Sequence, residues 1–217
     1  MKDILNNSKY ANEEFAQKLI AAENIYKEIH IACGNQHLNG CGSYLMNGKT
    51  YDYYIGMYPK QKLLYEAAKS ANSLLEIGTY MGHSLLISLL GNPNMDITCI
   101  DISDTYTRPA VTVLCKYFPN SKIEFIHKNS LEALLTLNKK FDLFHIDGHH
   151  ENNFITAEFI ACSKLSSKKE EMDVVFDDVE CCDTLITNIH KRYSSVSESR
   201  PGCDWTNTFL NIKLKDK

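Results

Sequence analysis

The chain contains no apolar run of the roughly 18–20 residues that a membrane-spanning helix requires. It also lacks a long basic run, and its formal net charge is −4. Nucleic-acid binding through bulk electrostatic attraction is therefore not expected. Residues 1–7 do not have the charged-then-apolar layout of a signal peptide, so we expect a cytosolic protein that does not contact a membrane.

Neither an internal repeat nor a low-complexity segment is present, and tryptophan occurs once. Cysteine is more frequent, with eight residues, several of which lie inside apolar runs. A cysteine in such a run behaves as a small buried hydrophobe, and without an export signal we expect all eight thiols to be reduced. Hydrophobic residues make up 44% of the 217 residues, which suits one α/β domain with a modest extension.

The first part of the chain differs from the rest. Residues 1–10 are polar and are expected to be frayed. Helical spacing follows, with apolar residues on one face at Phe15, Leu19, Ala22, Tyr26 and Ile29. Residues 32–56 hold five glycines and show no periodicity, and loops of about 25 residues are usually functional or disordered. We therefore predict that residues 1–59 form an N-terminal helix and a loop over a substrate, and that residues 60–217 form the main domain.

From residue 60 onward, short apolar runs alternate with stretches of helical spacing. The predicted strands are 73–77, 97–100, 123–126, 143–146 and 174–176, and the predicted helices between and after them are 85–90, 110–117, 131–137, 154–165 and 185–193. Such alternation predicts an α/β fold with a parallel sheet covered by helices on both faces. The segments 193–199 and 208–214 are separated by a short connection without a helix, so we expect an antiparallel pair.

A glycine-containing loop follows the first predicted strand. Gly78 and Gly82 lie four residues apart, and Glu76 precedes the first of them by two residues. Glycine allows a turn with positive φ and a close approach of a ligand, and the following helix presents free amides. The spacing fits neither a dinucleotide fingerprint nor a P-loop. A carboxylate at position 76 suits a cationic group better than a pyrophosphate.

An acidic residue, Asp101, ends the second predicted strand, where it can accept hydrogen bonds from the hydroxyls of a ribose. Together with the segment Glu76–Gly82, it resembles the first two cofactor motifs of class I S-adenosylmethionine-dependent methyltransferases. The resemblance runs from about residue 60 to the C-terminus. It implies a Rossmann-like, seven-stranded, mostly parallel sheet with an antiparallel last strand. It also implies S-adenosylmethionine as cofactor, with these binding residues: Glu76, Gly78, Thr79, Tyr80, Gly82, Ser84, Asp101, Asn129, Ser130, Asp147 and His149.

Carboxylates also end the fourth and fifth predicted strands, at Asp147 and at the pair Asp177 and Asp178. Because neighbouring parallel strands end at the same rim of a sheet, these acids are expected to lie close together. Clustered carboxylates repel one another unless a cation neutralises them. Oxygen ligands of this kind suit Mg²⁺, Ca²⁺ or Mn²⁺, although His149 and His150 leave zinc or iron open.

This pair of segments resembles the metal-dependent O-methyltransferases that act on sugar hydroxyls of macrolide and aminocoumarin antibiotics, and less closely the bacterial catechol-type enzymes. The resemblance implies a divalent metal, Mg²⁺ in the first place, on Asp147, Asp177 and Asp178. It also implies a general base two or three residues beyond the first of these acids. We assign His150 as the base and His149 to the cofactor side, and the reverse assignment stays open.

The sequence therefore predicts metal-dependent O-methylation of a small polyhydroxylated substrate, with a sugar ahead of a catechol. A small-molecule or glycan hydroxyl is the expected partner, and a homo-oligomer stays possible. One alternative is metal-independent methylation, in which the acids serve only as bases and helix caps. Another is a cofactor-binding module without catalysis.

Overall fold

The computed structural model describes residues 1–34, 44–46, 52–203 and 205–215. Most of the loop predicted at residues 32–56 therefore lies outside the described residues. Among the helices that are described, none combines the length and apolarity that crossing a membrane requires. None of the seven described cysteines is in a disulfide.

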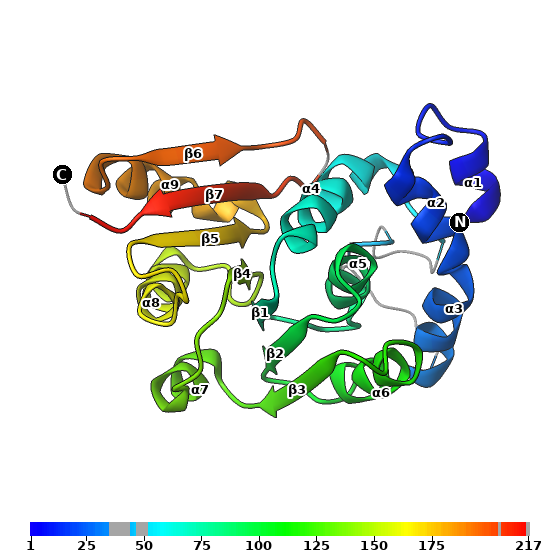
Figure 1. Ribbon diagram of the computed structural model, residues 1–217, viewed down its shortest axis with the longest axis horizontal. Coiled ribbons are helices and arrows are strands. Elements are labelled where there is room, and N and C mark those ends of the chain that lie inside the picture. Colours follow the sequence, from blue (N-terminus) through cyan, green and yellow to red (C-terminus); the bar gives the residue numbers. More distant parts are fainter. Residues whose placement is uncertain (35–43, 47–51, 204, 216–217) are drawn as a thin grey trace.

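Within the described residues, seven strands form one sheet in the order β3-β2-β1-β4-β5-β7-β6 (Figure 1). The strands are β1 Ser73–Ile77, β2 Asp96–Asp101, β3 Lys122–His127, β4 Leu143–Ile146, β5 Glu171–Phe176, β6 Val196–Ser199 and β7 Thr208–Lys213. Strands β1 to β5 pair in parallel, and β7 runs antiparallel to both β5 and β6. This is the Rossmann-like sheet that the sequence predicts.

Helices cover both faces of this sheet (Figure 1). Their bounds are α1 Lys2–Asn6, α2 Glu14–Ala21, α3 Glu23–Ala32, η1 Ile55–Met57 (a 3₁₀ turn), α4 Tyr58–Lys69, α5 His83–Gly91, α6 Thr107–Tyr117, α7 Ser130–Thr136, α8 Asn152–Ser163 and α9 Val179–Arg192. Side chains of α1 to α6 share one apolar core with Leu74 of β1, whereas α7 to α9 share the other with Leu75 and Ile77. Successive residues of a strand point to opposite faces, which is why a continuous apolar run serves both cores.

The N-terminal residues are more ordered than the sequence predicts. Residues 2–6 form α1, in which Leu5 is fully buried, and the Met1 amino group lies 3.2 Å from Glu23 Oε1. The expectation of a frayed segment at residues 1–10 was wrong, because a single buried leucine and an ion pair fix this end. The predicted helix is also two helices, α2 and α3, which are separated at Ala22 without a proline or glycine to signal the break.

The sheet order reverses beside β1, which pairs with β2 on one side and β4 on the other. Ile77 is in register with Ile100 of β2 and with Ile146 of β4, so the loops after these strands leave the sheet at the same rim. In open parallel sheets, ligands bind outside the carboxyl ends of the strands at such a reversal. The residues predicted for the site all follow strands at this rim or lie close to it.

Candidate active site

A cavity of about 670 Å³ opens at this rim. Its wall includes residues from the loops after β1, β2, β3, β4 and β5, and it joins the glycine loop to the cluster of carboxylates. The predicted cofactor residues in the wall are Gly78, Tyr80, Asp101, Asn129, Ser130, Asp147 and His149. The predicted base, His150, and the predicted metal ligands Asp177 and Asp178 also belong to the wall. The wall does not include four further predicted cofactor residues, which are Glu76, Thr79, Gly82 and Ser84. Of these four residues, Glu76, Thr79 and Ser84 have buried side chains, and Gly82 is the residue directly before α5.

The glycine loop has the backbone conformation that its sequence suggests. Gly78 and Gly82 have φ values of +82° and +67°, and Tyr80 between them has φ of 49°. A Cβ atom at position 78 would lie 1.9 Å from the carbonyl oxygen of Asp147. Glycine is therefore required at position 78, both for the left-handed backbone and for the close contact between the loops after β1 and β4.

Asp101 holds this loop in place. Its Oδ2 atom accepts hydrogen bonds from the backbone amides of Thr79 and Tyr80, at 3.0 and 2.7 Å. Its Oδ1 atom accepts one from the amide of Ser103 at 2.9 Å. An ionised carboxylate offers about four acceptor positions, so capacity for a ligand hydroxyl remains. Asp101 thus has a structural role in the loop that sequence reasoning did not foresee.

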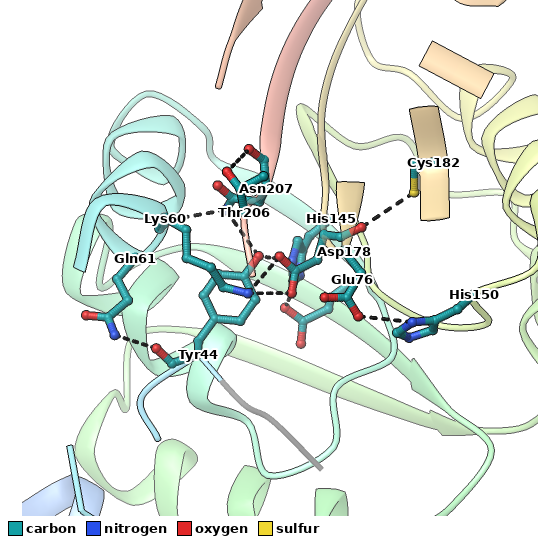
Figure 2. Close-up of polar contacts among 11 residues, drawn as sticks. Tyr44, Lys60, Gln61, Glu76, His145, His150, Asp178, Cys182, Thr206 and Asn207 are labelled. Carbon is teal, nitrogen blue, oxygen red and sulfur yellow. Dashed lines mark hydrogen bonds and ion pairs between the residues drawn. The ribbon is translucent and has the colours of Figure 1, made fainter. Parts of the chain in front are cut away.

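Glu76 lies behind the glycine loop and is fully buried. Its Oε2 atom is 2.9 Å from His145 Nδ1, and His145 Nε2 is 2.8 Å from the hydroxyl of Tyr44 (Figure 2). No partner within the described residues contacts Glu76 Oε1, although this atom is buried. A buried carboxylate oxygen without a partner is costly, and a cationic ligand group beside it would relieve that cost.

The carboxylates and one histidine also meet at the cavity wall. Asp147, His150 and Asp178 each offer an atom that could bind a metal, and these atoms lie within 4.8 Å of one another. His150 Nδ1 is 3.0 Å from Asp178 Oδ2. This hydrogen bond raises the pKa of His150 and lowers that of Asp178. Asp178 has a φ of 46°, a conformation that non-glycine residues rarely adopt and that often marks functional sites.

Asp177 is bound differently from the other two acids. Both of its carboxylate oxygens accept hydrogen bonds from Lys60 Nζ at 2.9 Å, and both side chains are buried. Burial lowers the pKa of the Lys60 ammonium, but the charges of Asp177 and Asp147 outweigh that effect and raise it. Burial and the charge of Asp177 raise the pKa of Asp147 well above its ordinary value. A lysine thus supplies a fixed positive charge inside the cluster.

Lys60 belongs to a network of residues that sequence reasoning missed. Its ammonium lies 4.4 Å from the ring centroid of Tyr44, and the Tyr44 hydroxyl accepts from Asn207 Nδ2 at 3.3 Å (Figure 2). Lys60 and Asp177 are 117 positions apart, so no local pattern could have joined them. His145 did carry a signal, because it is a polar residue in the middle of an apolar strand, between Phe144 and Ile146.

The remaining predicted residues, His149, Asn129 and Ser130, also belong to the cavity wall. His149 stacks on the ring of Phe154, with ring centroids 4.5 Å apart, and its Nδ1 atom accepts from the amide of Glu151. Asn129 Oδ1 accepts from the amide of Leu131 and so caps α7. Ser130, the first residue of α7, donates to Glu158 Oε1 at 2.5 Å. His149 and His150 therefore point to different surroundings.

Comparisons with known proteins agree with this architecture. Residues 75–179 match the model of a methyltransferase-domain family. An O-methyltransferase of Aspergillus hancockii, hkm8, is 30% identical over 107 residues, which are 48% of this chain and 42% of that protein. This chain therefore spans less than half of that relative's length.

Solved structures resemble the whole chain. An O-methyltransferase from Bacillus cereus, in complex with S-adenosylhomocysteine, superposes with a TM-score of 0.66 and covers 98% of this chain and 96% of its own, at 15% identity. The O-methyltransferase TomG from Streptomyces achromogenes, which takes part in tomaymycin synthesis and was solved with S-adenosylmethionine, gives a TM-score of 0.64 over 92% and 96% of the two chains, also at 15% identity. At this level of identity, the likeness establishes the fold.

The order of the sheet, the glycine loop and Asp101 at its rim define a class I methyltransferase fold. Residues 75–179 match a methyltransferase-domain family, and the chain as a whole has the fold of the two O-methyltransferases described above.

Proposed function

We propose that this protein transfers the methyl group of S-adenosylmethionine to a hydroxyl group of a small polyhydroxylated substrate. The observation that carries the proposal is the single cavity that joins the glycine loop and Asp101 to His150 and the carboxylates. One end suits a nucleoside with a cationic amino-acid group, and the other end suits an acceptor that must lose a proton. A sugar or a catechol presents two neighbouring oxygens of the kind that this acidic end would recognise.

The cofactor end uses the loops after the first three strands. Asp101 binds the ribose hydroxyls with its remaining acceptor positions, and Asn129 and Ser130 lie at the adenine. The buried Oε1 atom of Glu76 attracts the positive end of the cofactor's amino-acid part, just behind Gly78. These assignments extend the sequence predictions, and each depends on a residue at or directly behind the cavity wall.

At the acceptor end, we assign His150 as the general base. Asp178 accepts from Nδ1 of its ring, which fixes the tautomer and leaves Nε2 to take a proton. The acceptor oxygen forms a bond to the methyl carbon while the carbon–sulfur bond breaks, and the hydroxyl proton passes to Nε2. The products are the methyl ether and S-adenosylhomocysteine, and Asp178 stabilises the imidazolium that results.

A divalent metal fits part of this site. Asp147 and Asp178 offer carboxylate oxygens, which Mg²⁺ and Mn²⁺ prefer, and His150 lies within reach of the same point. When bound there, the metal would lower the pKa of the acceptor hydroxyl and orient it. Asp177, the third predicted ligand, is engaged on both oxygens by Lys60. Its use as a ligand would require that this pair separate.

The Lys60–Asp177 pair favours a second candidate, which is metal-independent O-methylation. A buried ammonium beside three carboxylates already supplies one of the positive charges that the cluster needs. In this alternative, Lys60 neutralises Asp177, and His150 with Asp178 removes the acceptor proton without further help. In either case Met46 and Met57, from the predicted N-terminal part, contribute to the cavity wall, which supports the prediction that this part lies over the substrate.

Transfer of labelled methyl from S-adenosylmethionine to panels of catechols and sugars tests the proposed function. We expect one acceptor class to be methylated, and activity to disappear with EDTA and return with Mg²⁺ or Mn²⁺. Calorimetry with Mn²⁺ provides a readout besides activity, since Asp178→Asn should weaken Mn²⁺ binding while S-adenosylhomocysteine still binds. Full turnover in EDTA would select the metal-independent candidate. Cofactor binding without transfer to any acceptor would favour a non-catalytic module.

Three further expectations from the sequence stay predictions. They are a cytosolic location, the possibility of a homo-oligomer and the absence of nucleic-acid binding.

A further inference from the structure

Glu158, on α8, is a buried carboxylate in the cavity wall that neither the sequence motifs nor the proposed mechanism uses. Its side chain is only 1% exposed, and its Oε1 atom accepts a hydrogen bond from the Ser130 hydroxyl at 2.5 Å. Its Oε2 atom is buried and has no partner within the described residues. The carboxylate packs against Gly148, where a Cβ atom would lie 3.3 Å from Oε1. Such a group is costly to bury and calls for a function.

The carboxylate determines the direction of the Ser130 hydroxyl. An ionised carboxylate only accepts hydrogen bonds, so Ser130 must use its one proton toward Glu158. The lone pairs of the Ser130 oxygen then remain for a partner in the cavity, whose wall includes Ser130. Burial raises the pKa of Glu158, and the hydrogen bond from Ser130 opposes that rise. Toward the cavity, Ser130 is therefore an acceptor.

The surroundings of Ser130 suit a flat aromatic ring. Ile100 and Ile102 contribute apolar wall from β2 and the residue after it, and the stacked pair of His149 and Phe154 contributes flat surface from the loop after β4. Asp101, the proposed ribose ligand, belongs to the same wall. A polar hydroxyl beside apolar walls is the arrangement that orients a nucleobase by its edge.

We propose that Ser130 accepts a hydrogen bond from the exocyclic amine of adenine, and that Glu158 is a positioning residue that makes the site select adenine over a 6-oxopurine. The inference rests on the proposed function, because it places the adenosine of the cofactor at this end of the cavity. In hypoxanthine, an oxygen acceptor replaces the amine. The Ser130 oxygen then either faces another acceptor or turns its proton away from Glu158 and leaves a buried carboxylate oxygen unpaired.

Calorimetry at pH 8, above the ordinary range of carboxyl pKa values, compares S-adenosylhomocysteine with its deaminated analogue S-inosylhomocysteine on the full chain. We expect the wild type to bind the adenine compound with about tenfold or more higher affinity. With the 6-oxo group, a buried acceptor loses a hydrogen bond whether the Ser130 proton stays on Glu158 or turns to the ligand. Glu158→Gln keeps the size of the side chain but can donate to Ser130. This frees the hydroxyl proton for the 6-oxo group, and the preference should fall to about threefold or less.

Two further variants complete the test. Ser130→Ala removes the hydroxyl and should reduce the preference in the same way. Glu132→Gln makes the same chemical change at an exposed position of α7 and should keep the wild-type preference. A loss of fold would weaken both ligands together, whereas the ratio of the two affinities reports only on base recognition. If Glu158→Gln does not fold, the ratio of the two ligand affinities in Ser130→Ala tests the inference instead.

The inference would be overturned if the wild-type protein bound both ligands with equal affinity. It would also be overturned if Glu158→Gln or Ser130→Ala had the same ratio of the two affinities as the wild type. If the wild type binds neither compound, the proposed function itself fails. The two failures are thus distinguishable, because the first leaves binding of S-adenosylhomocysteine intact.

Discussion

Replacement of Lys60 by methionine would remove an ammonium from a buried ion pair of the described site. Lys60 and Asp177 have side chains that are 3% and 5% exposed, and Nζ lies 2.9 Å from each carboxylate oxygen. Methionine fills a similar volume but leaves the Asp177 carboxylate buried without its partner. Removal of one member of such a pair destabilises a protein by about 3–5 kcal/mol. Because whole domains have a free energy of unfolding of about 5–15 kcal/mol, the expected loss is large.

Urea unfolding followed by circular dichroism gives the measurement, and the same helix provides a control. Lys62 pairs with Glu13 at 2.7 Å, but these side chains are 43% and 33% exposed, so Lys62→Met should cost at most about 1 kcal/mol. The double variant Lys60→Met/Asp177→Asn should lose less than the sum of its single variants, with a coupling of about 1–3 kcal/mol.

A Lys60→Met variant as stable as Lys62→Met would contradict this reasoning, and additive effects in the double variant would do the same. Either result would mean that the two groups do not form a buried ion pair in solution. It would also remove the observation that favours metal-independent chemistry.

Three further predictions concern the cofactor, the base and pH. Asp101→Ala should weaken binding of S-adenosylhomocysteine by about 1.5–3 kcal/mol in calorimetry, and unchanged affinity would refute the ribose assignment. His150→Ala should lower kcat by about 10²–10⁴-fold, whereas His149→Ala should act mainly on cofactor affinity, and the opposite pattern in steady-state kinetics would reverse the two roles. The third prediction concerns His30 and His83, whose Nε2 atoms lie 3.1 Å apart in the core. Burial lowers the pKa of His30 to about 4 and that of His83 well below its ordinary value, so the unfolded chain binds more protons below about pH 6.5. Stability should therefore fall as pH drops from about 6.5 to about 4, by up to about 1.4 kcal/mol per pH unit for each histidine, and His30→Phe should flatten this slope in thermal unfolding.

The centre of the sheet was predictable because strands β1, β2 and β4 are buried on both faces. Each parallel strand appears in the sequence as a short apolar run, and the structure places β1 and β4 at the bounds that the sequence predicts. The end of the chain was predictable for another reason, since the connection between β6 and β7 is too short for a helix. The N-terminal residues were misjudged, because Leu5 becomes buried when α1 packs against α2, and nothing in this polar segment signals that packing.

Within the site, the residues that sequence reasoning found lie in the last residues of a strand, in the segment that follows it or at the start of the next helix. The glycine loop, Asp101 and the acidic pair Asp177 and Asp178 could be located from strand ends alone. Lys60 and Glu158 could not, because each acquires its partner when its helix packs against a segment that is distant in the sequence. A lysine at the start of one helix and a glutamate in the middle of another resemble ordinary solvated charges until the fold buries them.

Isothermal titration of the purified chain with S-adenosylhomocysteine tests the central claim most directly. The account predicts saturable binding of one molecule per chain, displaced by S-adenosylmethionine and weakened by Asp101→Ala. No detectable heat or competition at millimolar ligand, with a folded chain, would contradict it.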